Sequence, residues 1–134
     1  MSMNEIIKPQ KTDKYSDTSN LLVDRYGRLF DYARVALNEK CNLRCVYCMP
    51  EEGIKFKPDK DLLSNGEIKR IISLLSDLGV KKIRLTGGEP LLREDIFDLI
   101  EYTSVKKKIR STQLTTNGVL LDSVVDRLTS SGLN

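Results

Sequence analysis

Three short segments of the chain alternate between polar and apolar positions with a period of two, and they predict strands. They cover residues 32–37, 81–86 and 111–116. Each is followed by apolar residues at intervals of three and four, which is typical of an amphipathic helix. The apolar faces of the three predicted helices carry Ile68, Ile71, Ile72, Leu75 and Leu78, then Ile96, Phe97, Leu99 and Ile100, and finally Leu121, Val124, Val125 and Leu128.

Capping residues mark the ends of the predicted helices. Ser64 and Glu67 have the spacing of a capping box, which places the first helix start next to them. Gly79 supplies the stop for this helix. Glu94 and Asp95 put acidic side chains at the start of the second helix, where negative charge interacts favourably with the helix dipole.

The order of elements, three successive strand–helix units, predicts an α/β fold with a parallel sheet and right-handed crossovers. Three strands are too few to close a barrel, and residues 132–134 fall where a fourth strand would begin. We therefore expect the front part of a TIM-like (β/α) barrel. Residues 1–20 are polar with few apolar anchors and are expected to form a flexible tail. The truncated domain would then cover residues 21–134, with a long loop at residues 49–61.

The alternation also sorts the strand residues onto two faces. We expect the apolar face to lie under the helices and the polar face to point into the barrel, although an open sheet with one solvated face would show the same alternation. Two arginines on an inward face indicate a lumen that binds a charged ligand. The polar face carries Arg34, Asn38, Lys82, Arg84, Thr86, Gln113, Thr115 and Asn117, and the apolar face carries Val35, Leu37, Ile83, Leu85 and Leu114.

Composition narrows the possible functions. Of the 134 residues, 22 are basic and 19 acidic, and the net charge of +3 is too weak to indicate nucleic-acid binding. No apolar run approaches the roughly 18 residues of a membrane span, and no secretory signal is evident. We therefore expect a cytoplasmic protein without a membrane partner. Histidine is absent, which leaves sulfur and oxygen as ligands for any metal.

Cys41, Cys45 and Cys48 lie within eight positions with the spacing C-x3-C-x2-C. Their odd number and the lack of a distant partner disfavour disulfides. Thiolates select zinc, copper(I) and iron–sulfur clusters. A structural zinc site would need a fourth ligand, whereas a 4Fe–4S cluster on three cysteines would leave one iron able to accept a small molecule. The alternative is an incomplete zinc site or plain buried thiols.

A second segment, Gly87-Gly88-Glu89-Pro90, follows the second predicted strand. Two glycines let backbone carbonyls approach a ligand closely, and Pro90 restricts Glu89 to extended geometry. Taken alone, this segment is also compatible with an ordinary strand-to-helix turn. In a barrel, however, it would lie at the same rim as the cysteines.

The two segments together resemble those of the radical S-adenosylmethionine (radical SAM) superfamily. The resemblance implies that the three cysteines hold a 4Fe–4S cluster whose open iron binds S-adenosylmethionine. The reduced cluster would then cleave a carbon–sulfur bond of this cofactor to give a 5′-deoxyadenosyl radical. Tyr47 matches the superfamily's aromatic residue beside the adenine. Gly87, Gly88 and Glu89 match the segment that receives the methionine amino group.

Longer stretches make the chain similar to the GTP 3′,8-cyclase family, also called molybdenum cofactor biosynthesis protein A. The similarity implies that Arg34, Arg84 and Thr115 contact GTP and that Lys82 lies near the same pocket. It also implies that Gly88 contacts S-adenosylmethionine. The similarity is carried by residues 24–34, 48–51, 81–91 and 114–118.

In that family the radical takes the ribose 3′ hydrogen of GTP, and the product is 3′,8-cyclo-7,8-dihydro-GTP. The resemblance further implies an external electron donor, a possible homodimer, and a second 4Fe–4S cluster from a C-terminal part that these residues do not include, so this part alone is expected to be inactive. One departure from many relatives is Asn38-Glu39, where they have Thr-Asp. Two alternatives stay open: a radical SAM enzyme for another substrate, such as a peptide or cofactor precursor, and a non-catalytic iron–sulfur electron-transfer or binding module.

Overall fold

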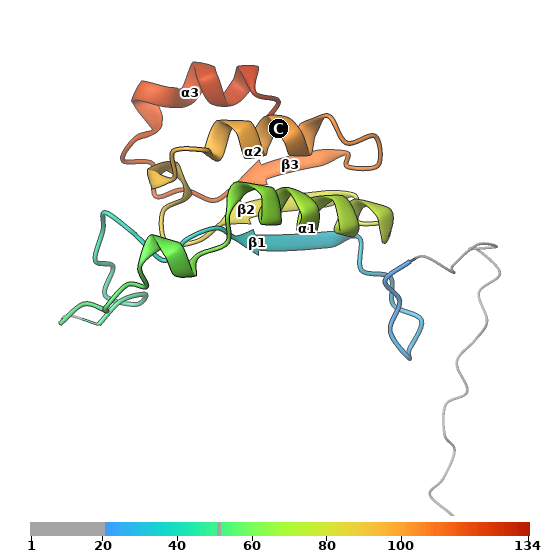
Figure 1. Ribbon diagram of the computed structural model, residues 1–134, viewed down its shortest axis with the longest axis horizontal. Helices are drawn as coiled ribbons and strands as arrows, with labels where there is room; N and C mark the ends of the chain where they lie inside the picture. The colour runs from blue at the N-terminus through green and yellow to red at the C-terminus, as the bar shows by residue number, and fades with distance from the viewer. Residues whose placement is uncertain (1–20, 51) are drawn as a thin grey trace, which may run out of the picture.

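The computed structural model describes residues 21–50 and 52–134, so the predicted tail at residues 1–20 lies outside it (Figure 1). All three predicted strand–helix units are present. The elements are β1 (Tyr32–Ala36), η1 (Asp59–Asp61), α1 (Asn65–Asp77), β2 (Lys82–Thr86), η2 (Pro90–Leu92), α2 (Ile96–Ser104), β3 (Ser111–Leu114) and α3 (Leu121–Ser130).

The strands form one parallel sheet in the order β1-β2-β3, as predicted. In Figure 1 their arrowheads all lie at the same edge, where the loops that follow them also lie. The polar and apolar faces separate as the alternation predicts. Ile83 and Leu85 of β2 are fully buried against the helices, whereas Arg34 and Lys82 are exposed on the other face. The core consists of Val35, Leu37, Ile68, Ile72, Val80, Ile83, Leu85, Ile96, Leu99, Ile100, Ile109 and Leu128.

Helix α1 begins at the predicted capping box. The Ser64 hydroxyl accepts a hydrogen bond from the Glu67 amide at 3.4 Å, and the Glu67 carboxylate accepts one from the Ser64 amide at 2.8 Å. The same serine hydroxyl also donates to the carboxylate, and these bonds lower the pKa of Glu67. Gly79 ends the helix with a φ of 88°, a conformation that glycine adopts without strain.

Some of the predicted boundaries differ from those in the structure. Strands β1 and β3 end before residues 37 and 116, although the Leu37 amide still donates to Thr86 at 2.8 Å and the Thr115 amide to Leu85 at 3.0 Å. Residues 90–92 form the short helix η2, and α2 begins only after Asp95. The Asp95 carboxylate does not cap α2, because it binds Arg93 instead.

The sheet is open, and its polar face is not covered by any of the residues described. The amide of Asn134 donates to the Thr112 carbonyl at 3.0 Å, which places the last residue along the outer edge of β3, where the sequence predicts a fourth strand. Among residues 21–50 and 52–134, no helix is long and apolar enough to cross a membrane.

Candidate functional site

The loop that follows β1 extends beyond the carboxyl edge of the sheet (Figure 1). This loop carries the three cysteines. The amides of Cys48 and Met49 both donate to the Cys45 carbonyl at 2.9 Å, which closes a turn in this loop. The three thiols are free of disulfides. Together with Gly88 they line one cavity of about 330 Å³. The structure therefore brings the cysteine segment and the glycine segment to the same place, as predicted.

Gly87 and Gly88 are needed because the backbone before the cysteines passes directly over them. The Asn38 carbonyl accepts a hydrogen bond from the Gly88 amide at 2.9 Å, and the Lys40 carbonyl accepts one from the Glu89 amide at 2.7 Å. A Cβ on Gly87 would lie 2.7 Å from the Asn38 oxygen, and one on Gly88 would collide with the Lys40 carbonyl. These glycines thus allow close approach of protein backbone, a requirement that the sequence argument assigned only to a ligand.

Glu89 is fully buried and holds the turn after β2 against the end of β3. One carboxylate oxygen accepts from the Leu91 amide at 3.0 Å and from the Thr116 hydroxyl at 2.8 Å. The other oxygen accepts from the Asn117 amide at 2.7 Å. Because protein donors surround the carboxylate, the Glu89 side chain positions the site. The contact with S-adenosylmethionine that the resemblance implies for Glu89 stays a prediction.

Asn117 continues this connection to the cysteine loop. Its side-chain nitrogen lies 3.7 Å from the Cys41 sulfur and 2.7 Å from the Asn42 side-chain oxygen. The alternation places Asn117 on the polar face, but no spacing rule links it to a cysteine. The link depends on the path of two loops at the carboxyl edge.

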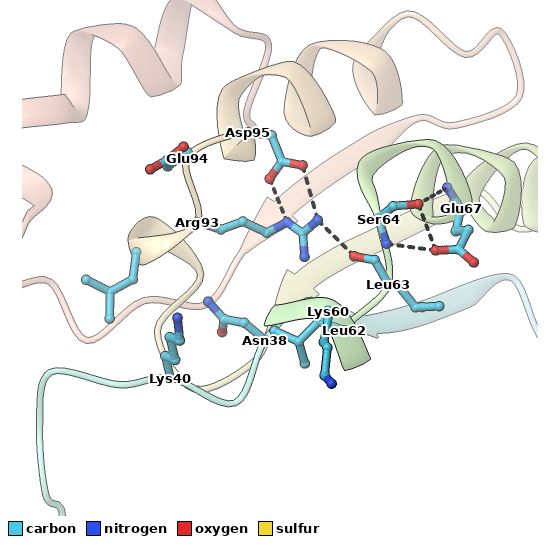
Figure 2. A pocket seen from close by; sticks show the side chains of 11 residues that line it. Asn38, Lys40, Lys60, Leu62, Leu63, Ser64, Glu67, Arg93, Glu94 and Asp95 are labelled. Atoms are coloured by element: carbon cyan, nitrogen blue, oxygen red, sulfur yellow. Dashed lines mark hydrogen bonds and ion pairs between the residues drawn. The ribbon is translucent and has the colours of Figure 1, made fainter. Parts of the chain in front are cut away.

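A second set of contacts between loops lies on the helix side, around a cavity of about 640 Å³ (Figure 2). Arg93, whose side chain is 14% exposed, crosses this region and binds the Asp95 carboxylate through Nε at 2.6 Å. Its Nη1 donates to the Leu37 carbonyl at 2.9 Å, and its Nη2 donates to the Leu63 carbonyl at 3.0 Å. Arg93 therefore fixes the exit of β1 relative to the starts of α1 and α2, a role that nothing in the sequence pattern indicates.

The polar face of the sheet brings two arginines side by side. Arg34 of β1 is the ladder partner of Arg84 of β2, which is in turn the partner of Gln113 of β3. Arg84 donates to the Gln113 side-chain oxygen at 2.6 and 3.1 Å, and Arg34 donates to the Tyr32 hydroxyl at 3.1 Å. Within the part of the chain that the structure describes, neither arginine forms a salt bridge with an acidic side chain.

Three further predicted residues lie at the surface. Lys82 is exposed at the start of β2, on the same face as the arginines, and Thr115 is exposed just after β3. Tyr47 lies in the turn of the cysteine loop with 92% of its surface exposed. A cavity of about 420 Å³ beside β3 is lined by Arg84 and Gln113, among others, but not by Lys82 or Thr115.

A sequence model of the Radical SAM superfamily matches residues 35–134. The chain belongs to this superfamily. The matched region starts inside β1 and includes the cysteine loop, the glycine segment and every later element. The expected partial (β/α) barrel is thereby confirmed as the fold class.

Curated relatives are similar to this radical SAM chain over most of its length. It is 46% identical over 113 residues to the GTP 3′,8-cyclase of Desulforamulus reducens, which covers 84% of this chain and 35% of the relative. It is 46% identical over 121 residues to the mitochondrial GTP 3′,8-cyclase of Arabidopsis thaliana, covering 90% and 31% respectively. It is 48% identical over 116 residues to molybdenum cofactor biosynthesis protein 1 of Mus musculus, covering 87% and 18%. The chain thus spans about a third or less of these relatives.

Solved structures share this fold. The crystal structure of BtrN in complex with AdoMet and 2-DOIA superposes with a TM-score of 0.65 at 25% identity, covering 79% of this chain and 44% of BtrN. BtrN in an open conformation superposes with a TM-score of 0.62 at 26% identity, covering 79% and 48%.

The superfamily implies a 4Fe–4S cluster, and the residues of this chain fit one. Three free thiols line one cavity. Among the described residues, no three cysteine, histidine or acidic side chains lie close enough together to hold a single metal ion. Three thiolates would leave one iron of a 4Fe–4S cluster open, whereas a structural zinc site would need a fourth ligand. The three thiols therefore fit such a cluster.

Proposed function

We propose that this chain is the cluster-binding part of a GTP 3′,8-cyclase of molybdenum cofactor biosynthesis. Its similarity to proteins named GTP 3′,8-cyclase supports the proposal. The observation that carries it is the pair of ladder partners Arg34 and Arg84 on the open polar face. Like charges that face each other across a ladder destabilise a sheet, and a bound polyanion removes this cost. A triphosphate suits such a pair, because each guanidinium can bind phosphate oxygens in a bidentate manner.

The neighbouring polar residues have supporting roles in this proposal. Gln113 accepts two hydrogen bonds from Arg84, which fixes the direction of that guanidinium before the nucleotide arrives. Thr115, just beyond β3, offers a hydroxyl to the substrate, and Lys82 adds positive charge on the same face. Three positive side chains on one open face favour an anionic substrate over a neutral one.

The cysteine loop would supply the cofactor site. Cys41, Cys45 and Cys48 would hold the 4Fe–4S cluster, and Tyr47 together with residues 87–89 would contact S-adenosylmethionine. When bound, the cluster and S-adenosylmethionine supply the one-electron chemistry that removes the 3′ hydrogen of the GTP ribose and leads to 3′,8-cyclo-7,8-dihydro-GTP. The protein's own contribution is to hold the cysteine loop rigidly against the glycine segment and to aim the nucleotide with the arginines.

Several parts of the proposal rest on family resemblance alone. They are a second 4Fe–4S cluster contributed by a C-terminal part, an external electron donor, a homodimer and a cytoplasmic location.

The substrate is tested with the complete gene product, reconstituted anaerobically with iron and sulfide. Formation of 5′-deoxyadenosine from S-adenosylmethionine should depend on GTP. Arg84→Ala should raise the KM for GTP by about 10- to 100-fold, because a hydrogen bond between charged groups contributes about 1.5–3 kcal/mol. The matched control is Arg70→Ala, which removes an exposed arginine from α1. If 5′-deoxyadenosine forms at the same rate with and without GTP, the proposed cyclase activity is refuted and a radical SAM enzyme for another substrate is favoured.

The cluster is tested on the chain itself. Cys45→Ala should abolish the visible absorbance of the reconstituted protein, since three thiolates are the minimum that holds the cluster. Val46→Ala, at the fully exposed next position, should leave it unchanged. Retained iron content in Cys45→Ala would argue against a cluster on these cysteines. An unchanged EPR spectrum after addition of S-adenosylmethionine would favour an electron-transfer or binding module.

A further inference from the structure

Asn117 is held in one orientation by groups on either side of it. Its backbone amide donates to the buried Glu89 carboxylate at 2.7 Å. Its side-chain oxygen accepts from the Val119 amide at 3.0 Å, so this end of the side-chain amide is fixed as the acceptor. The NH2 end must therefore point the other way, toward the cysteine loop.

The two protons of this NH2 group have two acceptors within reach. The Asn42 side-chain oxygen lies 2.7 Å from the nitrogen, and the Cys41 sulfur lies 3.7 Å from it. The first contact is an ordinary amide hydrogen bond. The second is within the range of an N–H···S hydrogen bond, which is longer because sulfur is larger.

The three cysteines are not equivalent in this respect. The Cys41 sulfur also accepts from the backbone amide of Leu43 at 3.5 Å, so two N–H donors face it. Within residues 21–50 and 52–134, the sulfurs of Cys45 and Cys48 accept no hydrogen bond. Cys41 is thus the cysteine whose sulfur faces two N–H donors, which would stabilise negative charge on it as a cluster ligand.

We propose that Asn117 sets the reduction potential of the cluster by donating a hydrogen bond to the Cys41 thiolate, with Glu89 as the positioning residue that holds it there. The inference rests on the proposed function, because it needs the cluster. Hydrogen bonds to the ligating sulfurs raise the potential of an iron–sulfur cluster, since the added electron increases the negative charge that they stabilise. Asn117 would therefore make the cluster easier to reduce, and reduction is what radical SAM chemistry requires.

The test is an EPR-monitored redox titration of the anaerobically reconstituted chain. Asn117→Ala removes the donor. Asn117→Asp keeps the acceptor for Val119 but replaces the donor with a negative charge. At a fixed potential, the ratio of reduced to oxidised cluster should fall about three- to tenfold in Asn117→Ala, and tenfold corresponds to about 59 mV for one electron. It should fall further in Asn117→Asp.

Asn42→Ala separates this role from a structural one. It removes the other acceptor of the Asn117 amide but leaves the contact with the sulfur. The ratio of reduced to oxidised cluster at the same fixed potential should therefore stay within twofold of wild type. A potential in Asn117→Ala equal to that of wild type would overturn the inference. So would an equal shift in Asn42→Ala, which would mean that Asn117 acts only by bracing the loop. Loss of the cluster from both Asn117 variants would also overturn it, by making Asn117 necessary for assembly. Absence of a cluster from the wild-type chain would instead refute the proposed function, and iron content measured first shows which has failed.

Discussion

Replacement of Glu89 by glutamine is the most informative single test of how the site is held together. The change keeps the size and shape of the side chain and removes one acceptor oxygen. In the native chain two donors converge on one carboxylate oxygen, from Leu91 and Thr116, and the Asn117 amide reaches the other. Glutamine has one oxygen, so in either orientation its NH2 group faces at least one N–H or O–H donor.

The expected cost follows from these contacts. In the better orientation Glu89→Gln retains two hydrogen bonds and leaves the partly buried Asn117 amide opposite another donor. A hydrogen bond to a charged group contributes about 1.5–3 kcal/mol, and an unsatisfied buried donor costs about 1–3 kcal/mol. The lost hydrogen bond and the unsatisfied donor belong to the same contact, so their free energies are not simply added. We therefore expect Glu89→Gln to lower the free energy of unfolding by about 3 kcal/mol.

Urea unfolding followed by far-ultraviolet circular dichroism measures this loss. With a denaturant slope of about 1–3 kcal/mol per M, the midpoint should fall by about 1–3 M. Glu94→Gln is the matched control, because Glu94 is exposed and close in sequence, and it should change stability by no more than about 0.5 kcal/mol. Coincident midpoints for the two variants would refute the claim that the Glu89 carboxylate holds the loops together.

Three further predictions concern the same framework. Gly88→Ala should lower the free energy of unfolding by about 1–3 kcal/mol, because its Cβ would collide with a backbone carbonyl that cannot rotate away. The control Gly66→Ala, with nothing within 4 Å of the added Cβ, should be neutral or slightly stabilising. Equal urea midpoints for the two variants would contradict the close packing at Gly88. Arg93→Lys loses the forked geometry that serves three acceptors and should lower the free energy of unfolding by about 2 kcal/mol, which thermal unfolding measures. A Tm as high as that of the control Arg70→Lys would show that Arg93 does not hold the exit of β1 against the starts of α1 and α2. The pKa of Glu67 lies below its usual 4.5 because the capping serine's hydroxyl donates to it, so its contribution is complete above that value and is lost as pH falls through the lower pKa of the folded state. The stability difference between wild type and Glu67→Gln should therefore shrink as pH falls from above 4.5 through the lowered pKa of Glu67, and a difference that stays constant would contradict this origin.

The local pattern of the sequence was sufficient for the elements and for the faces of the sheet. Ile83 and Leu85 alternate with Lys82 and Arg84, and this period of two places the apolar pair under the helices because only that face can be covered by apolar helix residues. The cysteine spacing likewise predicted a metal-binding segment, and the structure places its three thiols at one cavity. Both are short-range signals, carried by neighbouring residues.

Contacts between distant loops could not be predicted in this way. Arg93 binds the carbonyl of Leu37, and Asn117 reaches Cys41, across separations that no helical or strand period describes. Gly88 was identified, but its close neighbour is the Lys40 backbone, whose path depends on how two strands end side by side. Such contacts depend on tertiary geometry, and a polar residue in a loop gives no sign of its eventual partner.

The backbone pairing between the exit of β1 and the glycine segment also determines where the chain can be modified. Between Leu37 and Cys41 each hydrogen-bonded group has a set partner, so one inserted residue would shift the pairing with Gly88 and turn the cysteines away from their cavity. Lys55, in the loop beyond Met49, is exposed and lies outside any helix or strand. A fluorophore or epitope tag for following the cysteine loop in solution therefore belongs at Lys55, while the short link before Cys41 must keep its native length.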